Sequence, residues 1–171
     1  VYEEHSWIPV VSDLIKNIYK DSLPIFGVCF GHQLIAQALG GHVEKSIKGW
    51  GLGLHTYQIN NKTGYMSNLL EEVTLNICHQ DQVLQAPVGA TVYAKSDFCE
   101  NAGFYIKDKV LTMQAHPEFL VDFTKDLLAA RRDITIPKEF VDPALIKLKA
   151  KPESVQSAQF AETIRQFFKL S

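Results

Sequence analysis

Cys29 stands between two glycines, in the segment Gly27-Val28-Cys29-Phe30-Gly31. The apolar run 25–29 is typical of a buried strand, and directly after it apolar residues recur at the spacing of a helix. The pattern G-x-nucleophile-x-G marks a sharp strand-to-helix turn that raises the side chain of its central residue above the edge of the sheet. Sulfur at that place predicts a nucleophilic thiol.

The helix that follows this turn adds its own chemistry. A helix N-terminus carries a partial positive charge and free backbone N–H groups, which favour a thiolate over a thiol and can hold a developing oxyanion. The N–H of Phe30 is the first such donor that we expect. An ordinary thiol has a pKa of about 8.5, so Cys29 still needs a partner base to react as a thiolate at neutral pH.

His116 is the best candidate for that base. The stretch "VLTMQAHPE" places it at the end of a buried strand that a proline stops. Glu118 follows two residues later, where its carboxylate could accept the second imidazole N–H and fix the tautomer and orientation of the ring. A structural role at the end of a strand would explain His116 alone equally well. It explains the combination of Cys29 with His116 and Glu118 poorly.

The remaining candidates are less suited to this chemistry. We place His5 in the first helix and His55 in a strand, and His42 follows a glycine pair, so we interpret each as a surface or strand residue. We expect His32 to point away from the turn. Cys78 and Cys99 are small core or surface thiols, and no Cys/His spacing suits a metal ion. We expect no cofactor, because the chain also lacks a Gly-rich phosphate loop.

The elements around these residues are predicted from periodicity. Helical spacing occurs at 7–19, 34–39, 119–132, 144–149 and 155–168, and short strand-type runs occur at 25–29, 51–59, 73–78, 90–96, 103–107 and 110–116. Helix, strand, helix, many strands and then helices predict an α/β sheet covered by helices, with short hairpins at one edge.

Composition narrows the class of partner. The 171 residues are 46% hydrophobic, enough for one core, and we expect a single domain, 1–171. Seventeen basic and nineteen acidic residues give a net charge of −2 without a basic stripe, which favours a small-molecule substrate over nucleic acid. Three cysteines, an odd number, suggest a reducing compartment, and no apolar run reads as a membrane span or signal peptide. We therefore expect a cytoplasmic protein.

The stretches "PIFGVCFGHQLIAQALGG" and "LTMQAHPEF" together resemble the class I glutamine amidotransferase domain, in the branch of the GMP synthetase glutaminase domain and the stand-alone γ-glutamyl peptidases. The resemblance runs through the whole chain. It implies a mainly parallel central sheet flanked by helices, the flavodoxin-like three-layer fold of the family.

This resemblance also implies roles for named residues. Cys29 would attack the γ-carbonyl of glutamine or a γ-glutamyl compound to give a thioester, His116 would protonate the leaving amine and then activate water, and Glu118 would orient His116. Phe30 is the expected oxyanion donor. The expected substrate contacts are Gly31, Gln33, His79 and Asp81. A solvated position on the helix is the alternative for Gln33, and for His79 a role without direct contact is the stronger alternative.

One departure concerns the start of the chain. Family members have earlier strands and a glycine-bearing loop that donates a second oxyanion N–H, so we expect that the domain is truncated at its N-terminus. Loss of one such donor costs about 100-fold or more in rate. Three functions therefore stay open: a stand-alone γ-glutamyl hydrolase, a glutaminase subunit that supplies ammonia to a synthetase partner, and an inactive binding or regulatory domain. The helical segments after His116 favour the first.

Overall fold

The computed structural model describes residues 1–150 and 155–170, so the expected domain 1–171 extends over residues 151–154 and 171, which lie outside the described part. The helices are α1 (Trp7–Lys20), α2 (Phe30–Ala38), the short 3-10 helix η1 (Gly64–Met66), α3 (Val121–Arg131), α4 (Lys138–Ala150) and α5 (Ser157–Leu170). The strands are β1 (Ile25–Val28), β2 (His42–Lys45), β3 (Gly51–Ile59), β4 (Glu72–His79), β5 (Asp81–Gln85), β6 (Thr91–Lys95), β7 (Gly103–Ile106) and β8 (Val110–Met113). Among these helices, none is both long and apolar enough to cross a membrane.

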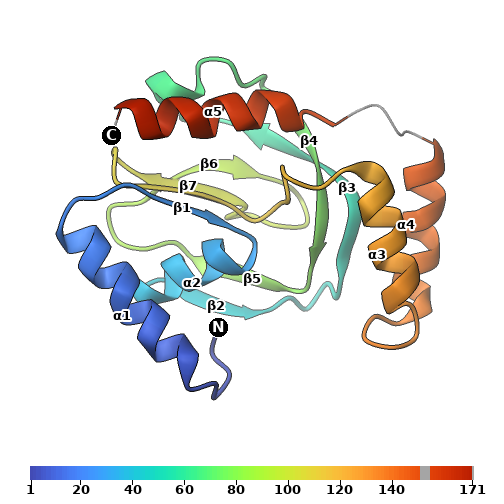
Figure 1. Ribbon diagram of the computed structural model, residues 1–171. Coiled ribbons are helices and arrows are strands. Elements are labelled where there is room, and N and C mark those ends of the chain that lie inside the picture. The colour runs from blue at the N-terminus through green and yellow to red at the C-terminus, as the bar shows by residue number, and fades with distance from the viewer. Residues whose placement is uncertain (151–154, 171) are drawn as a thin grey trace.

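Six strands form one curled sheet in the order β1-β8-β7-β6-β3-β4, and β2 pairs with β5 separately (Figure 1). The α/β class with flanking helices is confirmed. The expectation of a mainly parallel sheet is wrong for the described strands, because β1 and β8 are parallel whereas the other pairs are antiparallel. The physical reason is the length of the connections: β7 and β8 are joined only by 107–109, and a parallel pair needs a much longer crossover.

Helices cover both faces of the sheet, as Figure 1 shows for α1 and α2 on one side and α5 on the other. Along β7, Phe104 packs into the cluster under α1 and α2, whereas its neighbour Tyr105 packs against the cluster that contains Phe160 and Phe167 of α5. Successive side chains of a strand point to opposite faces, so one short strand contributes to both cores.

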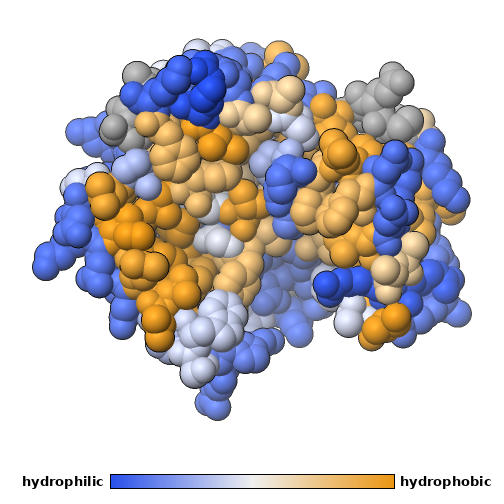
Figure 2. Space-filling model, viewed as in Figure 1, coloured by the Kyte–Doolittle hydropathy of each residue, from blue (hydrophilic) through white to orange (hydrophobic). Residues whose placement is uncertain are grey.

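A third apolar cluster lies beside the curled end of the sheet. There α4 packs against β3 and α3 packs against α4, and their shared cluster contains Leu52, Leu128, Ile136, Val141 and Leu148. On the face shown in Figure 2, apolar surface gathers in two places, one over α1 and one over α3. Exposed Trp7, Val10 and Leu14 belong to the α1 side.

Three elements differ from the sequence prediction. Strands β2 and β5 were not predicted, because their sequences "HVEK" and "DQVLQ" are mostly polar. Helix α4 begins at Lys138 and contains Pro143, whereas the sequence predicts helical spacing only over 144–149. Pro143 stands inside this helix, beyond its first turn, so its missing N–H removes one backbone hydrogen bond from the helix.

The junction between β1 and α2 depends on a close approach at Gly27. A Cβ atom at this position would lie 2.5 Å from Cδ1 of Ile35 and 2.8 Å from the carbonyl of Gly31. Gly31 is different, because a Cβ atom there would meet nothing within 4 Å. Gly27 therefore sets how closely α2 sits on the strand, whereas Gly31 leaves open space beside the turn.

We expect Gly27→Ala to lower the free energy of unfolding by about 1–3 kcal/mol, because the added methyl group overpacks a contact that includes backbone atoms. Gly31→Ala is the matched control, and it should leave stability unchanged or raise it by up to about 1 kcal/mol, because alanine favours the helix. Urea unfolding followed by circular dichroism measures both. Equal losses in the two variants would show that the close approach at Gly27 does not set the stability of this junction.

Candidate active site

Cys29 occupies a strained turn between β1 and α2. Its φ is +48° and its ψ −102°, a combination that a residue with a side chain rarely adopts. The turn is held from both sides, because the Cys29 N–H donates to the carbonyl of Met113 at 2.8 Å and the Cys29 carbonyl accepts from the N–H of Gln33 at 3.1 Å. The strand-to-helix turn that the sequence predicts is thus present, and its strain is held by β8 and by the first turn of α2.

The thiol of Cys29 differs from the sequence expectation. Its pKa is raised to about 12, mainly by burial and to a smaller extent by the nearby Cys78 and Glu118. The backbone N–H of Phe30 and the side-chain amide of Gln114 lower the pKa, but by less. The expected preference for a thiolate is therefore wrong for this structure, because desolvation outweighs the helix N-terminus and leaves a neutral thiol at neutral pH.

His116 lies just beyond β8 and is fixed by three contacts. The backbone N–H of His116 donates to the carbonyl of Asn76 in β4 at 2.8 Å. This bond draws the chain away from β7 and towards the far edge of the sheet. Nδ1 of His116 lies 2.7 Å from Oε1 of Glu118, and its ring stacks on Phe119 with centroids 3.9 Å apart. Since a carboxylate only accepts, Nδ1 carries the proton and Nε2 is left as the basic nitrogen.

Cys29 and His116 line one cavity. This cavity has a volume of about 300 Å³, and Cys29, Trp50, Cys78, His116, Phe119, Leu127, Arg131 and Ile136 line it. The structure thus brings the predicted nucleophile and base from separate elements to the same hollow. Glu118 lies behind His116, with its side chain half-exposed.

A chain of side-chain amides leads to the sulfur. Gln114 donates from Nε2 to Sγ of Cys29 at 3.6 Å, and its Oε1 accepts from Nε2 of Gln33 at 3.1 Å. The same nitrogen of Gln33 also donates to the carbonyl of Asp81 at 2.8 Å. Gln33 is buried, so its amide nitrogen positions Gln114 and through it the thiol. Its expected contact with substrate stays a prediction.

The other expected contacts lie around a second cavity, of about 320 Å³, which Cys29, Phe30, Gln33, His79 and Asp81 help to line. His79 is buried and donates from Nδ1 to the carbonyl of Asp81 at 3.0 Å. Burial lowers the pKa of His79 to about 4, so it is a neutral wall residue. Phe30 is exposed and its ring meets Trp7, while Gly31 leaves open space.

Sequence reasoning missed three residues around Cys29. Gln114 donates to its sulfur, and Trp50 and Cys78 line both of its cavities. A signal for Gln114 existed, because it stands two residues before His116 at the end of the same run and so shares its side of the chain. Trp50 and Cys78 come from β3 and β4 or directly beside them. Nothing local in those segments marks them, since they reach Cys29 only through the curl of the sheet.

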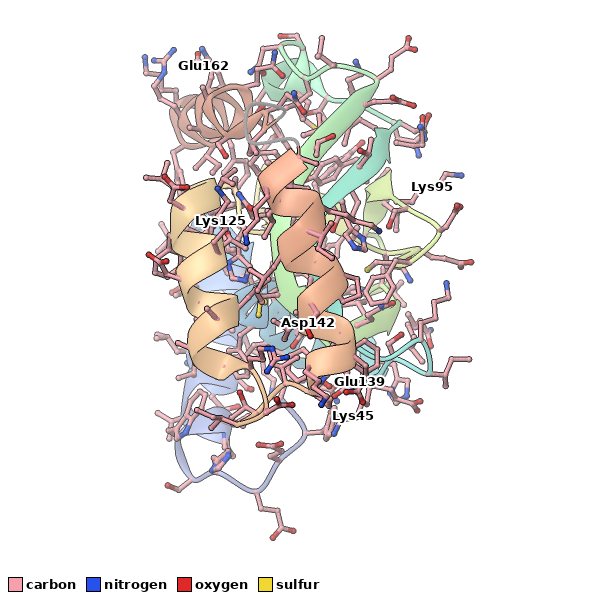
Figure 3. The ribbon with its side chains drawn as sticks, turned by 90° about the vertical axis from the view of Figure 1, so that its right-hand side faces the viewer. Lys45, Lys95, Lys125, Glu139, Asp142 and Glu162 are labelled. Carbon is pink, nitrogen blue, oxygen red and sulfur yellow. The ribbon has the colours of Figure 1, made fainter. Side chains whose placement is uncertain are left out.

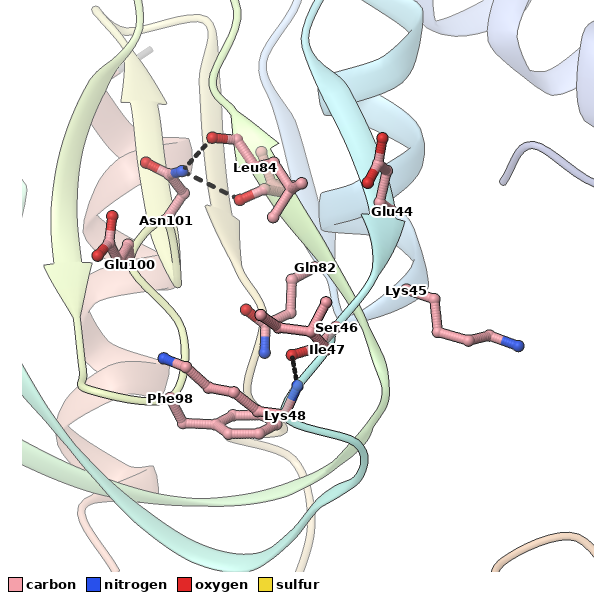
Figure 4. Close-up of a pocket in the computed structure, with 11 residues that line it drawn as sticks. Glu44, Lys45, Ser46, Ile47, Lys48, Gln82, Leu84, Phe98, Glu100 and Asn101 are labelled. Atoms are coloured by element: carbon pink, nitrogen blue, oxygen red, sulfur yellow. Dashed lines mark hydrogen bonds between the residues drawn. The ribbon is translucent and has the colours of Figure 1, made fainter.

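A third cavity, of about 240 Å³, opens between β2, β5 and the connection after β6 (Figure 4). Gln82 points into it beside Phe98, and Lys48, Glu100 and Asn101 stand around it. It is lined by no cysteine or histidine, so it holds no counterpart of the Cys29 and His116 pair. Across the described residues, no group of three or more His, Cys, Asp or Glu side chains could hold a metal ion.

Comparison with protein families places this geometry in context. Residues 5–131 match the family model described as glutamine amidotransferase class-I. Among curated proteins, "Gamma-glutamyl peptidase 4" of Arabidopsis thaliana is 37% identical over 132 residues, which are 74% of this chain and 53% of that protein. "GMP synthase [glutamine-hydrolyzing]" of Finegoldia magna is 33% identical over 119 residues, 69% of this chain and 22% of that protein.

Solved structures agree on the fold. A glutamine amidotransferase from Thermotoga maritima superposes with a TM-score of 0.77 at 22% identity, over 98% of this chain and 73% of that one. The matched part of the chain covers 53% of the Arabidopsis relative, which is about half of its length. The family match at 5–131 includes the strand-to-helix turn at Cys29 and the His116–Glu118 pair.

We expect alkylation of Cys29 by iodoacetamide to accelerate about tenfold per pH unit between about pH 6 and 9 without levelling, because its buried thiol has a pKa of about 12. Mass spectrometry of the modified peptide gives the rate at this residue, and Cys29→Ser identifies the signal. A plateau near neutral pH would mean that the helix N-terminus outweighs burial after all.

Buried neutral histidines should make the protein sensitive to acid. Burial lowers the pKa of His32 to about 3 and of His79 to about 4. The unfolded chain therefore binds protons first, so their contribution to stability is complete above about pH 6.5 and falls by about 1.4 kcal/mol per group and pH unit below it. Urea titrations from pH 7 to about pH 5 measure this slope, and His79→Gln should make it shallower. An unchanged slope would assign the acid sensitivity to other groups.

Proposed function

Since the chain belongs to the class I glutamine amidotransferase family, we propose that it hydrolyses the γ-glutamyl amide bond of glutamine or of a γ-glutamyl compound through a thioester on Cys29. The observation that carries the proposal is the shared cavity of Cys29 and His116, with the strained turn on one wall and the Glu118-supported imidazole on another. We also propose that residues 1–171 form one domain.

The first step forms the thioester. Sγ of Cys29 attacks the γ-carbonyl carbon while its proton passes to Nε2 of His116, so that no free thiolate has to exist beforehand. This coupling suits a thiol whose pKa burial raises to about 12. The C–N bond then breaks, and the proton on His116 moves to the leaving amine. His116 and Glu118 act as one unit, because Glu118 accepts from Nδ1 and so stabilises the imidazolium that forms.

The backbone supplies the charge stabilisation. The N–H of Phe30 opens α2 and already interacts with the sulfur, where it lowers the pKa of Cys29. When the carbonyl oxygen becomes negative, this donor and the N-terminus of α2 stabilise it. Water, deprotonated by His116, then attacks the thioester, releases glutamate and returns the thiol to Cys29.

A second candidate is a glutaminase that passes ammonia to a synthetase partner. It is favoured by the likeness to the GMP synthase of Finegoldia magna, of which this chain matches 22%. The higher coverage of the γ-glutamyl peptidase, 53%, favours hydrolysis with water as the acceptor and a small-molecule substrate. Glutamate release from glutamine and from a γ-glutamyl dipeptide, with the full-length protein alone, separates the two. Strong turnover of the dipeptide supports the peptidase, and weak activity on glutamine alone supports the partner-dependent enzyme.

We expect Cys29→Ala and His116→Asn each to lower kcat by about 10⁴-fold, and Glu118→Gln by about 10²-fold because its carboxylate is half-exposed. His42→Asn is the control, since His42 also lies beside a carboxylate, Glu44 at 2.6 Å, but on the surface. Released glutamate measures the rates. Normal turnover by Cys29→Ala, or an equal loss in His42→Asn, would contradict the assignment.

A further inference from the structure

Two cavities meet at the sulfur of Cys29. The first holds Phe30, Gln33 and Asp81, and the second holds His116 and Phe119. Three residues line both: Cys29, Trp50 and Cys78. A scissile amide placed over Cys29 would therefore extend into a hollow on either side.

The mechanism proposed above decides which half of the substrate lies on which side. His116 must reach the leaving nitrogen to protonate it, so the leaving group lies in the cavity that His116 lines. The acyl half then lies on the side of Phe30, whose N–H opens α2. Ammonia, the leaving group from glutamine, would leave most of the His116 side unfilled.

The His116 side is mostly apolar. Four of its lining side chains are Trp50, Phe119, Leu127 and Ile136, and they come from the β3 end, the turn after His116, α3 and the loop before α4. Such a surface gains free energy by covering an apolar side chain of a ligand. One lining residue is charged: Arg131, the last residue of α3.

Arg131 differs from its neighbour Arg132 in its partners. Arg132 holds Asp142 of α4 through two hydrogen bonds, of 2.7 and 2.8 Å, and also Asp133 at 2.9 Å (Figure 3 shows Asp142 on α4 beside α3). For Arg131, no ion pair occurs within residues 1–150 and 155–170. Its positive charge instead acts on Cys78, whose pKa it lowers against the effect of burial.

We propose that Arg131 binds the carboxylate of a leaving amino acid, and that the apolar walls around it select a γ-glutamyl amino acid or peptide with an apolar leaving residue. This inference rests on the proposed hydrolysis and narrows its substrate class. A guanidinium beside an apolar wall is suited to a carboxylate, which it binds through two parallel hydrogen bonds.

A purely structural role for Arg131 makes a different prediction. As a cation in the last turn of α3, it interacts favourably with the helix dipole. In that role its removal would lower stability slightly and affect all substrates alike. Dependence on a carboxylate in the leaving group is the signature of the binding role.

The experiment compares Arg131→Gln with the wild-type full-length protein on three substrates: γ-glutamyl-leucine, γ-glutamyl-leucinamide and glutamine. We expect kcat/KM for γ-glutamyl-leucine to fall by about 10- to 100-fold, because a charged hydrogen-bonding partner is lost. The values for the amide and for glutamine should change by less than about threefold. Arg131→Lys should restore part of the loss. Arg132→Gln is the matched control, and it should leave the ratio between the acid and the amide unchanged.

The outcomes separate the two proposals. An equal loss on all three substrates, or a changed acid-to-amide ratio in Arg132→Gln, would overturn the role of Arg131. Binding of γ-glutamyl-leucine to Cys29→Ser, measured by calorimetry with and without Arg131→Gln, needs no turnover. The wild-type protein could hydrolyse none of the three substrates while this binding still depends on Arg131 and on the carboxylate. In that case the proposed function fails and the binding site remains. If binding is independent of Arg131, the inference fails whatever the activity.

Discussion

The rest of the site depends on one constraint: the backbone at Cys29 is held in a conformation that it would not adopt alone. A φ of +48° for a residue with a side chain is stable only where the surroundings compensate for it. Here β8 accepts the Cys29 N–H and α2 uses its carbonyl, while Gly27 allows the helix to lie close to the strand. The parallel pair β1 and β8 therefore fixes the position of the sulfur, and the chain beyond β8 carries His116 to the same cavity.

Burial determines the chemistry of this sulfur more than the helix does. The same dry surroundings that raise the pKa of Cys29 also keep His79 neutral. Gln33 and Gln114 meet the need for polar contacts there with uncharged amides, which lose less than ions do when they are removed from water. A neutral thiol next to a supported imidazole is then the resting arrangement, and proton transfer belongs to the step of attack itself.

Short-range signals in the sequence were enough for the turn and for the His116–Glu118 pair, because glycine spacing, a strand-stopping proline and a two-residue separation are all local. The mainly parallel sheet was implied by the resemblance, whereas the short connection between β7 and β8 already requires an antiparallel pair. Strand β2 is mostly polar and pairs with β5, which lies far along the chain, so no local pattern predicts this pair. The pKa of Cys29 depends on how many atoms surround the sulfur, and Trp50 and Cys78 reach it from remote strands. Such features arise from packing between distant segments, which no local pattern encodes.

The pair of α3 and α4 has a consequence for how this protein moves. Helix α4 packs on β3 and α3 packs on α4, through an apolar cluster separate from the two clusters that hold the sheet between α1, α2 and α5. Sub-global opening of a domain takes place in contiguous cooperative units, at a lower free energy than global unfolding, and such units often coincide with a supersecondary motif like this helix pair. Since Leu127 and Ile136 wall the Cys29 cavity from this unit, its local opening would admit and release molecules while the strained turn stays intact.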